Sequence, residues 1–171
     1  MIIQRLIEVA IAKRNEKRML AKGAYEVGAS HYPYMVTMHI CFFISLIVEV
    51  LVFDRTIAPL FLAFLFLFVT VQLLRIWCLT SLGSFWNTKI IILPEANVVK
   101  NGPYTFMRHP NYVVVCLEII LLPIMFQAYF TAIVFTLLNI AMLSVRIPAE
   151  EKALREATNY EDKFKKKISV S

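Results

Sequence analysis

One stretch of the chain gathers residue types that bind small charged ligands. It reads Val98-Val99-Lys100-Asn101-Gly102-Pro103-Tyr104-Thr105-Phe106-Met107-Arg108-His109-Pro110-Asn111-Tyr112. Gly-Pro is a turn signal, and Pro110 disfavours the helical conformation of His109, so the chain stays extended before the next helix. The result is either a polar loop with an aromatic belt or a binding loop built from two tyrosines, an arginine and a histidine.

A second candidate element is the segment Arg146-Ile147-Pro148-Ala149-Glu150-Glu151. If a helix continues through the proline, Arg146 and Glu150 are four residues apart and share a face. A surface ion pair would explain them structurally. Functionally, the two side chains could flank a ligand that carries both signs of charge.

The composition places these elements in a membrane protein. Of the 171 residues, 59% are hydrophobic and 18% are charged, against about 25% charged residues in average soluble domains. The net charge of +6 comes from basic residues clustered between apolar runs, which favours membrane topology over nucleic-acid binding. The three cysteines lie in apolar stretches without CxxC spacing, so we expect inert thiols and no metal site.

Apolar runs predict an all-α integral membrane protein, with residues 1–171 forming a single domain of about five spans. A span needs about 20 apolar residues. Residues 35–53 and 57–79 meet this length, whereas the run 112–146 is long enough for two short spans with a turn near Pro123 and Gln127. Residues 1–13 are ambiguous between a span and an interfacial helix, and we favour the span. From Pro148 onward, an alanine and aromatic stripe predicts a separate amphipathic helix. The expected spans are thus 1–13, 35–53, 57–79, 112–125 and 129–146.

The distribution of Lys and Arg predicts the orientation. Fifteen of them lie in the first loop, in residues 80–111 and after the last span, and Arg55 stands alone on the opposite side. Because cytoplasmic loops carry an excess of basic residues, we expect residues 95–112 and 146–167 to face the cytoplasm.

Together the two candidate elements resemble the isoprenylcysteine carboxyl methyltransferase family of membrane enzymes. The similarity covers residues 72–165 and consists of Gly102 to Tyr104, Arg108 to Tyr112, a helical hairpin, and Arg146 followed by paired glutamates. Thr105 and Lys163-Phe164 depart from the family pattern at the rim of the site. The GPY and RHPNY motifs alone also occur in membrane sterol reductases.

The resemblance implies an S-adenosylmethionine site, with S-adenosylhomocysteine as product. It assigns Arg146 to the acceptor and implies catalytic roles for Arg146, Glu150 and Arg108. The sulfonium group of this cofactor is a cation, which a carboxylate and the faces of tyrosine rings attract. The sequence has no GxGxxG motif after a strand, which excludes a soluble Rossmann-type cofactor domain. The implied cofactor contacts are Ala96, Asn97, Val98, Val99, Tyr104, His109, Pro110, Asn111, Tyr112 and Glu150.

Ionisable residues inside the spans are further candidates. They are His39, Arg75 and Glu118, together with the polar Gln72. Gln72 and Arg75 share a helix face and line the acceptor pocket together with Glu118, or else Arg75 and Glu118 pair with each other to hold the bundle. Glu49 lies near the outer end, where we expect its side chain to snorkel.

The acceptor is expected to be a lipophilic small molecule or a lipidated substrate in contact with membrane lipids. Two chemistries stay open: an isoprenylcysteine-type carboxylate, or the hydroxyl of a long-chain alkylpyrone-like lipid, for which His109 or Glu118 could act as base. The alternatives are a nicotinamide-dependent membrane reductase and a non-enzymatic lipid-binding protein.

Overall fold

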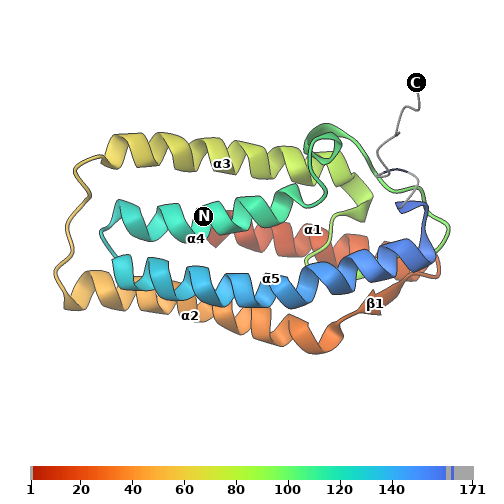
Figure 1. The fold of residues 1–171 in the computed structure, drawn as a ribbon, viewed down its shortest axis with the longest axis horizontal. Helices are drawn as coiled ribbons and strands as arrows, with labels where there is room; N and C mark the ends of the chain where they lie inside the picture. The colour runs from red at the N-terminus through yellow and green to blue at the C-terminus, as the bar shows by residue number, and fades with distance from the viewer. Residues whose placement is uncertain (1, 161–162, 164–171) are drawn as a thin grey trace, which may run out of the picture.

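The computed structural model describes residues 2–160 and Lys163, which form a bundle of helices with a small sheet at one end (Figure 1). The strands pair antiparallel, Tyr25 opposite Ile92 and Val27 opposite Ile90. The elements are α1 (Ile2–Leu20), β1 (Tyr25–Val27), η1 (Ala29–His31), α2 (Tyr32–Val52), α3 (Phe61–Leu82), η2 (Gly83–Phe85), β2 (Ile90–Ile92), η3 (Gly102–Thr105), α4 (Pro110–Met125) and α5 (Tyr129–Ala157).

The prediction of a mostly helical protein with helices suited to a membrane is confirmed, whereas the number of about five spans stays a prediction. Within the described residues, three helices are long and apolar enough to cross a membrane, covering Ala29–Val52, Phe61–Phe85 and Tyr129–Ala157, and α4 is a shorter apolar helix. Their outward faces carry exposed side chains such as Ile44, Phe66 and Leu137. Many apolar side chains exposed along several long helices are typical of a surface in contact with lipid.

The turn between α4 and α5 lies where the sequence predicts it. Pro123 occupies the last turn of α4, and Gln127 adopts a positive φ of 55° in the three-residue connection. At the same end, Glu49 is only 4% exposed and accepts hydrogen bonds from the backbone N–H groups of Phe130 and Thr131 at 3.1 and 2.7 Å. The expectation that Glu49 snorkels is therefore wrong. Its carboxylate lies inside the protein, where it accepts hydrogen bonds from N–H groups that have no partner within α5.

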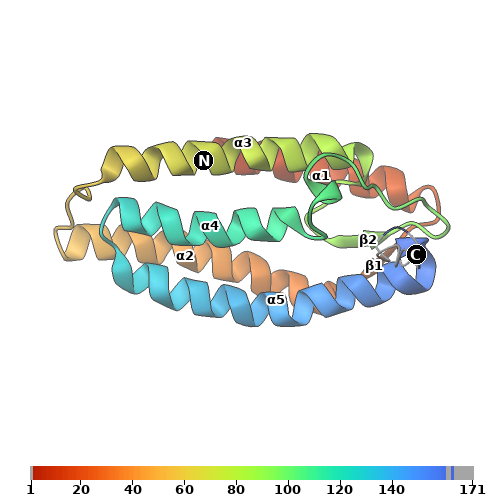
Figure 2. The same ribbon diagram turned by 45° about the horizontal axis from the view of Figure 1, so that its top comes forward.

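The predicted break at Pro148 is also wrong, since α5 continues unbroken from Tyr129 to Ala157 and curves over that length (Figure 2). A proline removes one helical hydrogen bond, a cost that packing on both sides can offset. Here Arg146 before the proline and Ala153 after it are both buried. Ala153 packs against Ile90 and Ile92 of β2, so the sheet holds the far half of α5.

Helix α1 differs from the expected span over residues 1–13. It is longer, and it begins beside the middle of α4 and runs toward the sheet, so it lies along only half of the bundle (Figures 1 and 2). It is not among the described helices apolar enough to cross a membrane. The bundle-facing stripe is partly polar, which explains the ambiguity of its sequence, and consists of Glu8, Ala12, Asn15 and Met19.

The three basic segments predicted to share one side do gather at one end of the bundle (Figure 1). The sheet, which the sequence did not reveal, ties two of them together. Lys89 bridges Glu16 of α1 at 2.8 Å and Glu26 of β1 at 3.0 Å. Of the predicted C-terminal region 146–167, Phe164 and the final lysines lie outside the described residues.

Candidate functional site

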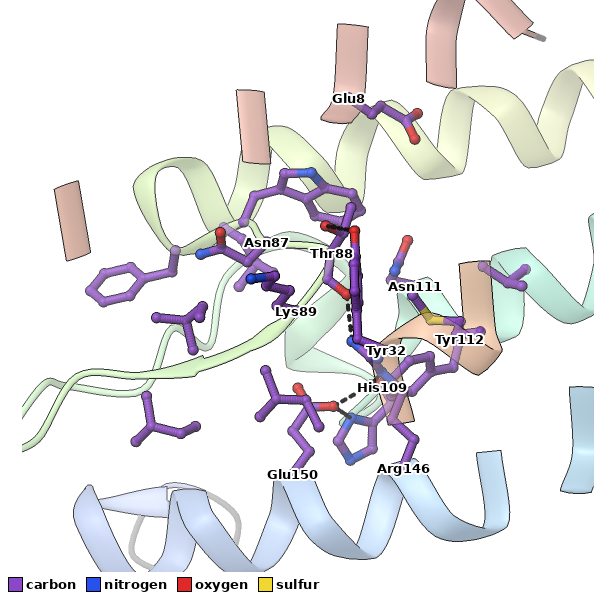
Figure 3. A pocket seen from close by; sticks show the side chains of 18 of the residues that line it. Glu8, Tyr32, Asn87, Thr88, Lys89, His109, Asn111, Tyr112, Arg146 and Glu150 are labelled. Atoms are coloured by element: carbon purple, nitrogen blue, oxygen red, sulfur yellow. Dashed lines mark hydrogen bonds and ion pairs between the residues drawn. The ribbon is translucent and has the colours of Figure 1, made fainter. Parts of the chain in front are cut away.

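A cavity of about 560 Å³ opens at the basic end of the bundle. Its walls come from α1, α2, α4, α5, the strand β2 and the loop 96–99, so segments distant in sequence converge on one space (Figure 3). The volume lies in the range typical of small-molecule sites. This cavity is the candidate site.

A chain of three polar side chains joins α4 to α5 at the wall of the cavity. The Tyr112 hydroxyl donates to Oε2 of Glu150 at 2.5 Å and accepts from Nε of Arg146 at 3.0 Å. Arg146 also donates from Nη2 to the backbone carbonyl of Thr88 at 2.5 Å, which links α5 to the segment that leads into strand β2 (Figure 3). Arg146 and Glu150 can share the tyrosine because α5 stays helical through Pro148, which puts them on one face.

The second glutamate, Glu151, organises the rim of the cavity. Its carboxylate contacts Nε2 of His109 at 3.1 Å and accepts a hydrogen bond from Tyr160 at 3.2 Å. Burial, followed by the nearby Glu151 carboxylate, raises the pKa of Tyr160 to about 12, so this hydroxyl stays protonated and donates. His109 in turn lies 5.4 Å from the ring centre of Tyr112. The rim and the polar chain are therefore one connected structure.

The loop 96–99 is fastened to the end of α5. Asn159 accepts a hydrogen bond from the backbone N–H of Val98 at 2.9 Å and donates to the Asn97 side chain at 2.7 Å, while the N–H of Glu95 bonds to the Ala157 carbonyl at 2.9 Å. The N–H of Val98 is thus used within the chain. The N–H of Ala96 is also used, in a 3.3 Å hydrogen bond to the Leu93 carbonyl, whereas the amides of Asn97 and Val99 make no hydrogen bond within the described part of the chain.

The comparisons with known proteins agree with this arrangement. The sequence profile described as "Isoprenylcysteine carboxyl methyltransferase (ICMT) family" matches residues 64–156, which contain both candidate elements and the hairpin between them. The chain belongs to this family. The resemblance inferred from the two motifs is confirmed, and the chain is a membrane methyltransferase at the level of its family.

Two relatives extend the similarity over nearly the whole chain. A protein of Bacillus subtilis (strain 168), described as uncharacterized protein YpbQ, is 50% identical over 156 residues, which cover 91% of this chain and 93% of the relative. An uncharacterized protein of Haemophilus influenzae is 31% identical over 159 residues, covering 88% of each. No solved structure matches the chain.

The structure brings the residues predicted for this ICMT-family site together. Arg146 lines the cavity, as do nine of the ten predicted cofactor contacts. Pro110 is the exception: it is buried as the first residue of α4 and sets the direction of His109 without facing the cavity. The nine are Ala96, Asn97, Val98, Val99, Tyr104, His109, Asn111, Tyr112 and Glu150. Their roles toward a ligand stay predictions.

Arg108, predicted to be catalytic, lies at the outer edge of the cavity. Its side chain is 46% exposed, its Nη1 lies 3.5 Å from Glu151, and its guanidinium lies over the Tyr160 ring at 5.9 Å. This position suits a residue that shapes the rim, where it stabilises Glu151.

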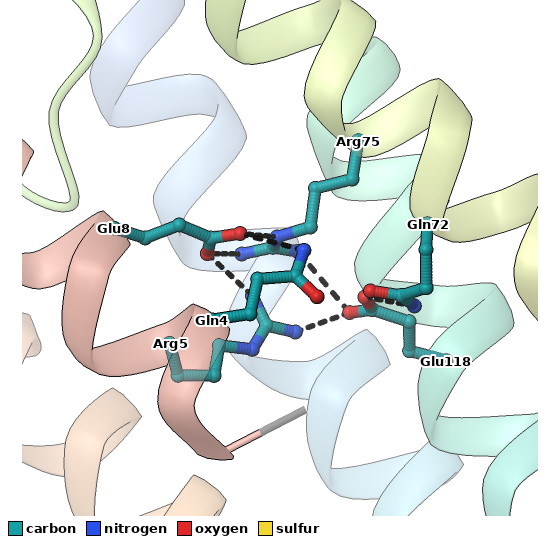
Figure 4. A network of polar contacts seen from close by, with 6 residues as sticks. All are labelled: Gln4, Arg5, Glu8, Gln72, Arg75 and Glu118. Atoms are coloured by element: carbon teal, nitrogen blue, oxygen red, sulfur yellow. Dashed lines mark hydrogen bonds and ion pairs between the residues drawn. The ribbon is translucent and has the colours of Figure 1, made fainter.

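Besides Arg146, two residues were predicted for the acceptor, and these two differ in position. Arg75 lines the cavity, whereas Glu118 does not and is 1% exposed. The alternative that they pair is what the structure shows, with Arg75 Nη1 lying 3.1 Å from Glu118 (Figure 4). Arg75 also makes two contacts of 2.7 Å with Glu8, and Arg5 contacts Glu118 as well. Gln72 completes the network with a 2.8 Å hydrogen bond to Glu118.

Several residues of the site were missed by sequence reasoning. Tyr32 and Thr88 line the cavity, and Thr88 acts through its backbone carbonyl, which has no sequence signature. Asn159 anchors the loop 96–99 from just beyond the end of α5. Glu8 could have been identified from the sequence, because a charged residue in an apolar segment usually has a buried partner of opposite charge.

The chemistry of the cavity fits S-adenosylmethionine. The Oδ1 of Asn111 is buried and has no hydrogen-bond partner in the described part of the chain, so it can accept a hydrogen bond from a ligand ammonium. Burial raises the pKa of the Tyr104 hydroxyl, which keeps the ring neutral, and a neutral ring face attracts a sulfonium cation. The set therefore offers acceptors, a carboxylate and aromatic faces to a positively charged ligand.

Proposed function

We propose that the protein transfers a methyl group from S-adenosylmethionine to an oxygen atom of a lipophilic acceptor. The observation that carries this proposal is the hydrogen-bonded chain from Arg146 through Tyr112 to Glu150 at the wall of one cavity. It puts a cation and an anion on the same wall of a space whose lining is polar around these side chains and mostly apolar along α2.

The polar end would hold the cofactor, which supplies a methyl group on a positively charged sulfur. Glu150 and the faces of Tyr104 and Tyr112 would stabilise this charge, and Asn111 would accept from the ammonium group. The backbone of Ala96–Val99 would form hydrogen bonds with the remaining polar groups of the cofactor. In this arrangement the enzyme holds the donor in one orientation, which can lower the barrier by several kcal/mol.

The apolar end would hold the acceptor. It is lined by side chains of α2 and α5, and Leu6 of α1 and Ile40 of α2 belong both to the cavity wall and to the exposed apolar surface. An acceptor dissolved in the bilayer could therefore enter between helices, while Arg146 faces its polar head. The further wall residues are Val36, Phe43, Met142 and Leu143.

The basic end of the bundle would face the cytoplasm, where S-adenosylmethionine is made available. The proposal rests on the positive-inside rule together with the gathering of all three basic segments at the end where the cavity opens. A site at the inner leaflet also excludes water from the reacting oxygen.

The direct test is methyl transfer from methyl-labelled S-adenosylmethionine to lipid extract, using purified protein in nanodiscs. We expect label in the lipid phase, with base-labile product indicating a carboxylate acceptor and base-stable product a hydroxyl. Glu150→Gln should abolish transfer, whereas Glu156→Gln, an exposed position on the same helix, should not. Binding of NADPH in place of S-adenosylhomocysteine would overturn the proposal in favour of a reductase.

A further inference from the structure

An acceptor oxygen must be ionised before it can attack a methyl group. A carboxylic acid is already ionised near neutral pH, whereas a hydroxyl must give its proton to a base. The two bases considered from the sequence are poorly placed for this. Nε2 of His109 is engaged by Glu151 at the rim, and Glu118 points into the buried network and does not line the cavity.

His39 of α2 occupies the position that these two residues do not. The cavity-facing side of α2 follows helical spacing and is apolar beyond Tyr32, with Met35, Val36, Ile40 and Phe43, and His39 is its one ionisable group. Placing an imidazole among apolar side chains costs free energy unless it is hydrogen-bonded, and an ionisable residue inside a span is a candidate for a functional role.

The protonation of the His39 ring is fixed by one hydrogen bond. Its Nδ1 lies 2.8 Å from the backbone carbonyl oxygen of Met35. Because a carbonyl can only accept, Nδ1 carries the hydrogen in this contact. In the neutral ring Nε2 then carries a free lone pair, and no hydrogen bond to Nε2 is found among the described residues. The ring is preset to accept a proton from a ligand.

Charged side chains on three other helices act on the His39 ring. Arg5 of α1, Glu118 of α4 and Arg146 of α5 all interact with it electrostatically. Arg75 of α3 lies in the same cavity and is neutralised by Glu8 and Glu118. Arg146 is the residue expected to face the acceptor, so the imidazole and the guanidinium border the same acceptor space from α2 and α5.

We propose that His39 is the general base of the reaction and that the acceptor is a phenolic or enolic hydroxyl on a lipophilic molecule. This inference rests on the proposed methyl transfer from S-adenosylmethionine. Nε2 takes the hydroxyl proton, the oxygen forms a bond to the methyl carbon, and the carbon–sulfur bond breaks. Its electron pair stays on sulfur, giving S-adenosylhomocysteine, the methyl ether and an imidazolium that releases its proton to solvent.

The test uses two matched acceptors, para-dodecylphenol and its ortho-nitro derivative. The nitro group acidifies the hydroxyl, so in mildly alkaline buffer this second acceptor is already a phenolate and needs no base. His39→Gln should slow methylation of para-dodecylphenol by about 100-fold, as expected for loss of a general base, and slow the nitro derivative far less. His31→Gln, a histidine outside the cavity wall, serves as the matched control and should change neither rate.

Binding of S-adenosylhomocysteine is measured for every variant, which separates this inference from the proposed function. An equal loss of rate with both phenols, or no loss with either, overturns the role of His39. Methylation of dodecanoic acid but of neither phenol by the unchanged protein also overturns it, while leaving methyl transfer intact. Failure of the unchanged protein to bind S-adenosylhomocysteine overturns the proposed function itself.

Discussion

The Tyr112 hydroxyl donates a 2.5 Å hydrogen bond to the Glu150 carboxylate across the interface of α4 and α5. Tyr112 closes the RHPNY motif and Glu150 begins the glutamate pair, so the two sequence elements meet in one contact. With Arg146 donating to the same hydroxyl, the tyrosine fixes the orientation of a cation and an anion together. Loss of this hydroxyl should therefore disturb both ends of the cavity.

Tyr112→Phe should weaken binding of S-adenosylhomocysteine by roughly tenfold or more. Without its donor, the Glu150 side chain has to be ordered when the ligand binds, and about 1.4 kcal/mol of such ordering cost corresponds to a factor of ten in affinity. The measurement is calorimetric titration in detergent, with the exposed Tyr34→Phe as control. Equal affinity of both variants would show that Glu150 keeps its position without the tyrosine.

Arg75→Met should destabilise the protein by about 3–5 kcal/mol, because it leaves carboxylates buried without their cation. The double variant Arg75→Met with Glu8→Met should lose less, since Arg5, Glu118 and Gln72 remain as a balanced set. Thermal unfolding in detergent measures both. A double variant less stable than the single one would mean that Glu8 stabilises α1 independently of Arg75.

The sequence predicted those parts of the protein that follow from local pattern. The α4–α5 turn was foreseen from Pro123 and the length of the apolar run, and the pairing of Arg75 with Glu118 was one of the two alternatives that the sequence left open. The convergence of Tyr112 and Glu150 followed from the family pattern.

What the sequence did not reveal depends on contacts between distant segments. Two strands of three residues carry too little pattern to detect, and their pairing exists because α5 supplies a surface for Ile90 and Ile92. That same surface keeps α5 helical past Pro148, against local preference. Helix α1 was ambiguous because its bundle-facing stripe is partly polar, and its partners Arg75 and Glu118 come from two other helices.

Glu49→Gln should lower stability by about 1 kcal/mol or more and leave binding of S-adenosylhomocysteine unchanged. The carboxylate accepts hydrogen bonds from two N–H groups at the start of α5, where the helix dipole stabilises a negative charge, and it lies 3.6 Å from Arg55. Glutamine would remove this charge. Asp54→Asn, in the exposed turn nearby, is the control. A large loss of ligand affinity in Glu49→Gln would show that the two ends of the bundle are coupled.

The orientation in the membrane can be tested with single cysteines in a variant whose Cys41, Cys78 and Cys116 are replaced by alanine. Lys22→Cys and Lys152→Cys report on the basic end and Ile57→Cys on the opposite turn, and all three positions are exposed. In intact cells a membrane-impermeant maleimide should label only Ile57→Cys, and the other two should react after permeabilisation, because the positive-inside rule puts the basic end in the cytoplasm. Labelling of Lys22→Cys in intact cells would put the cavity on the side that lacks S-adenosylmethionine, and the proposed reaction would then have no supply of its methyl donor.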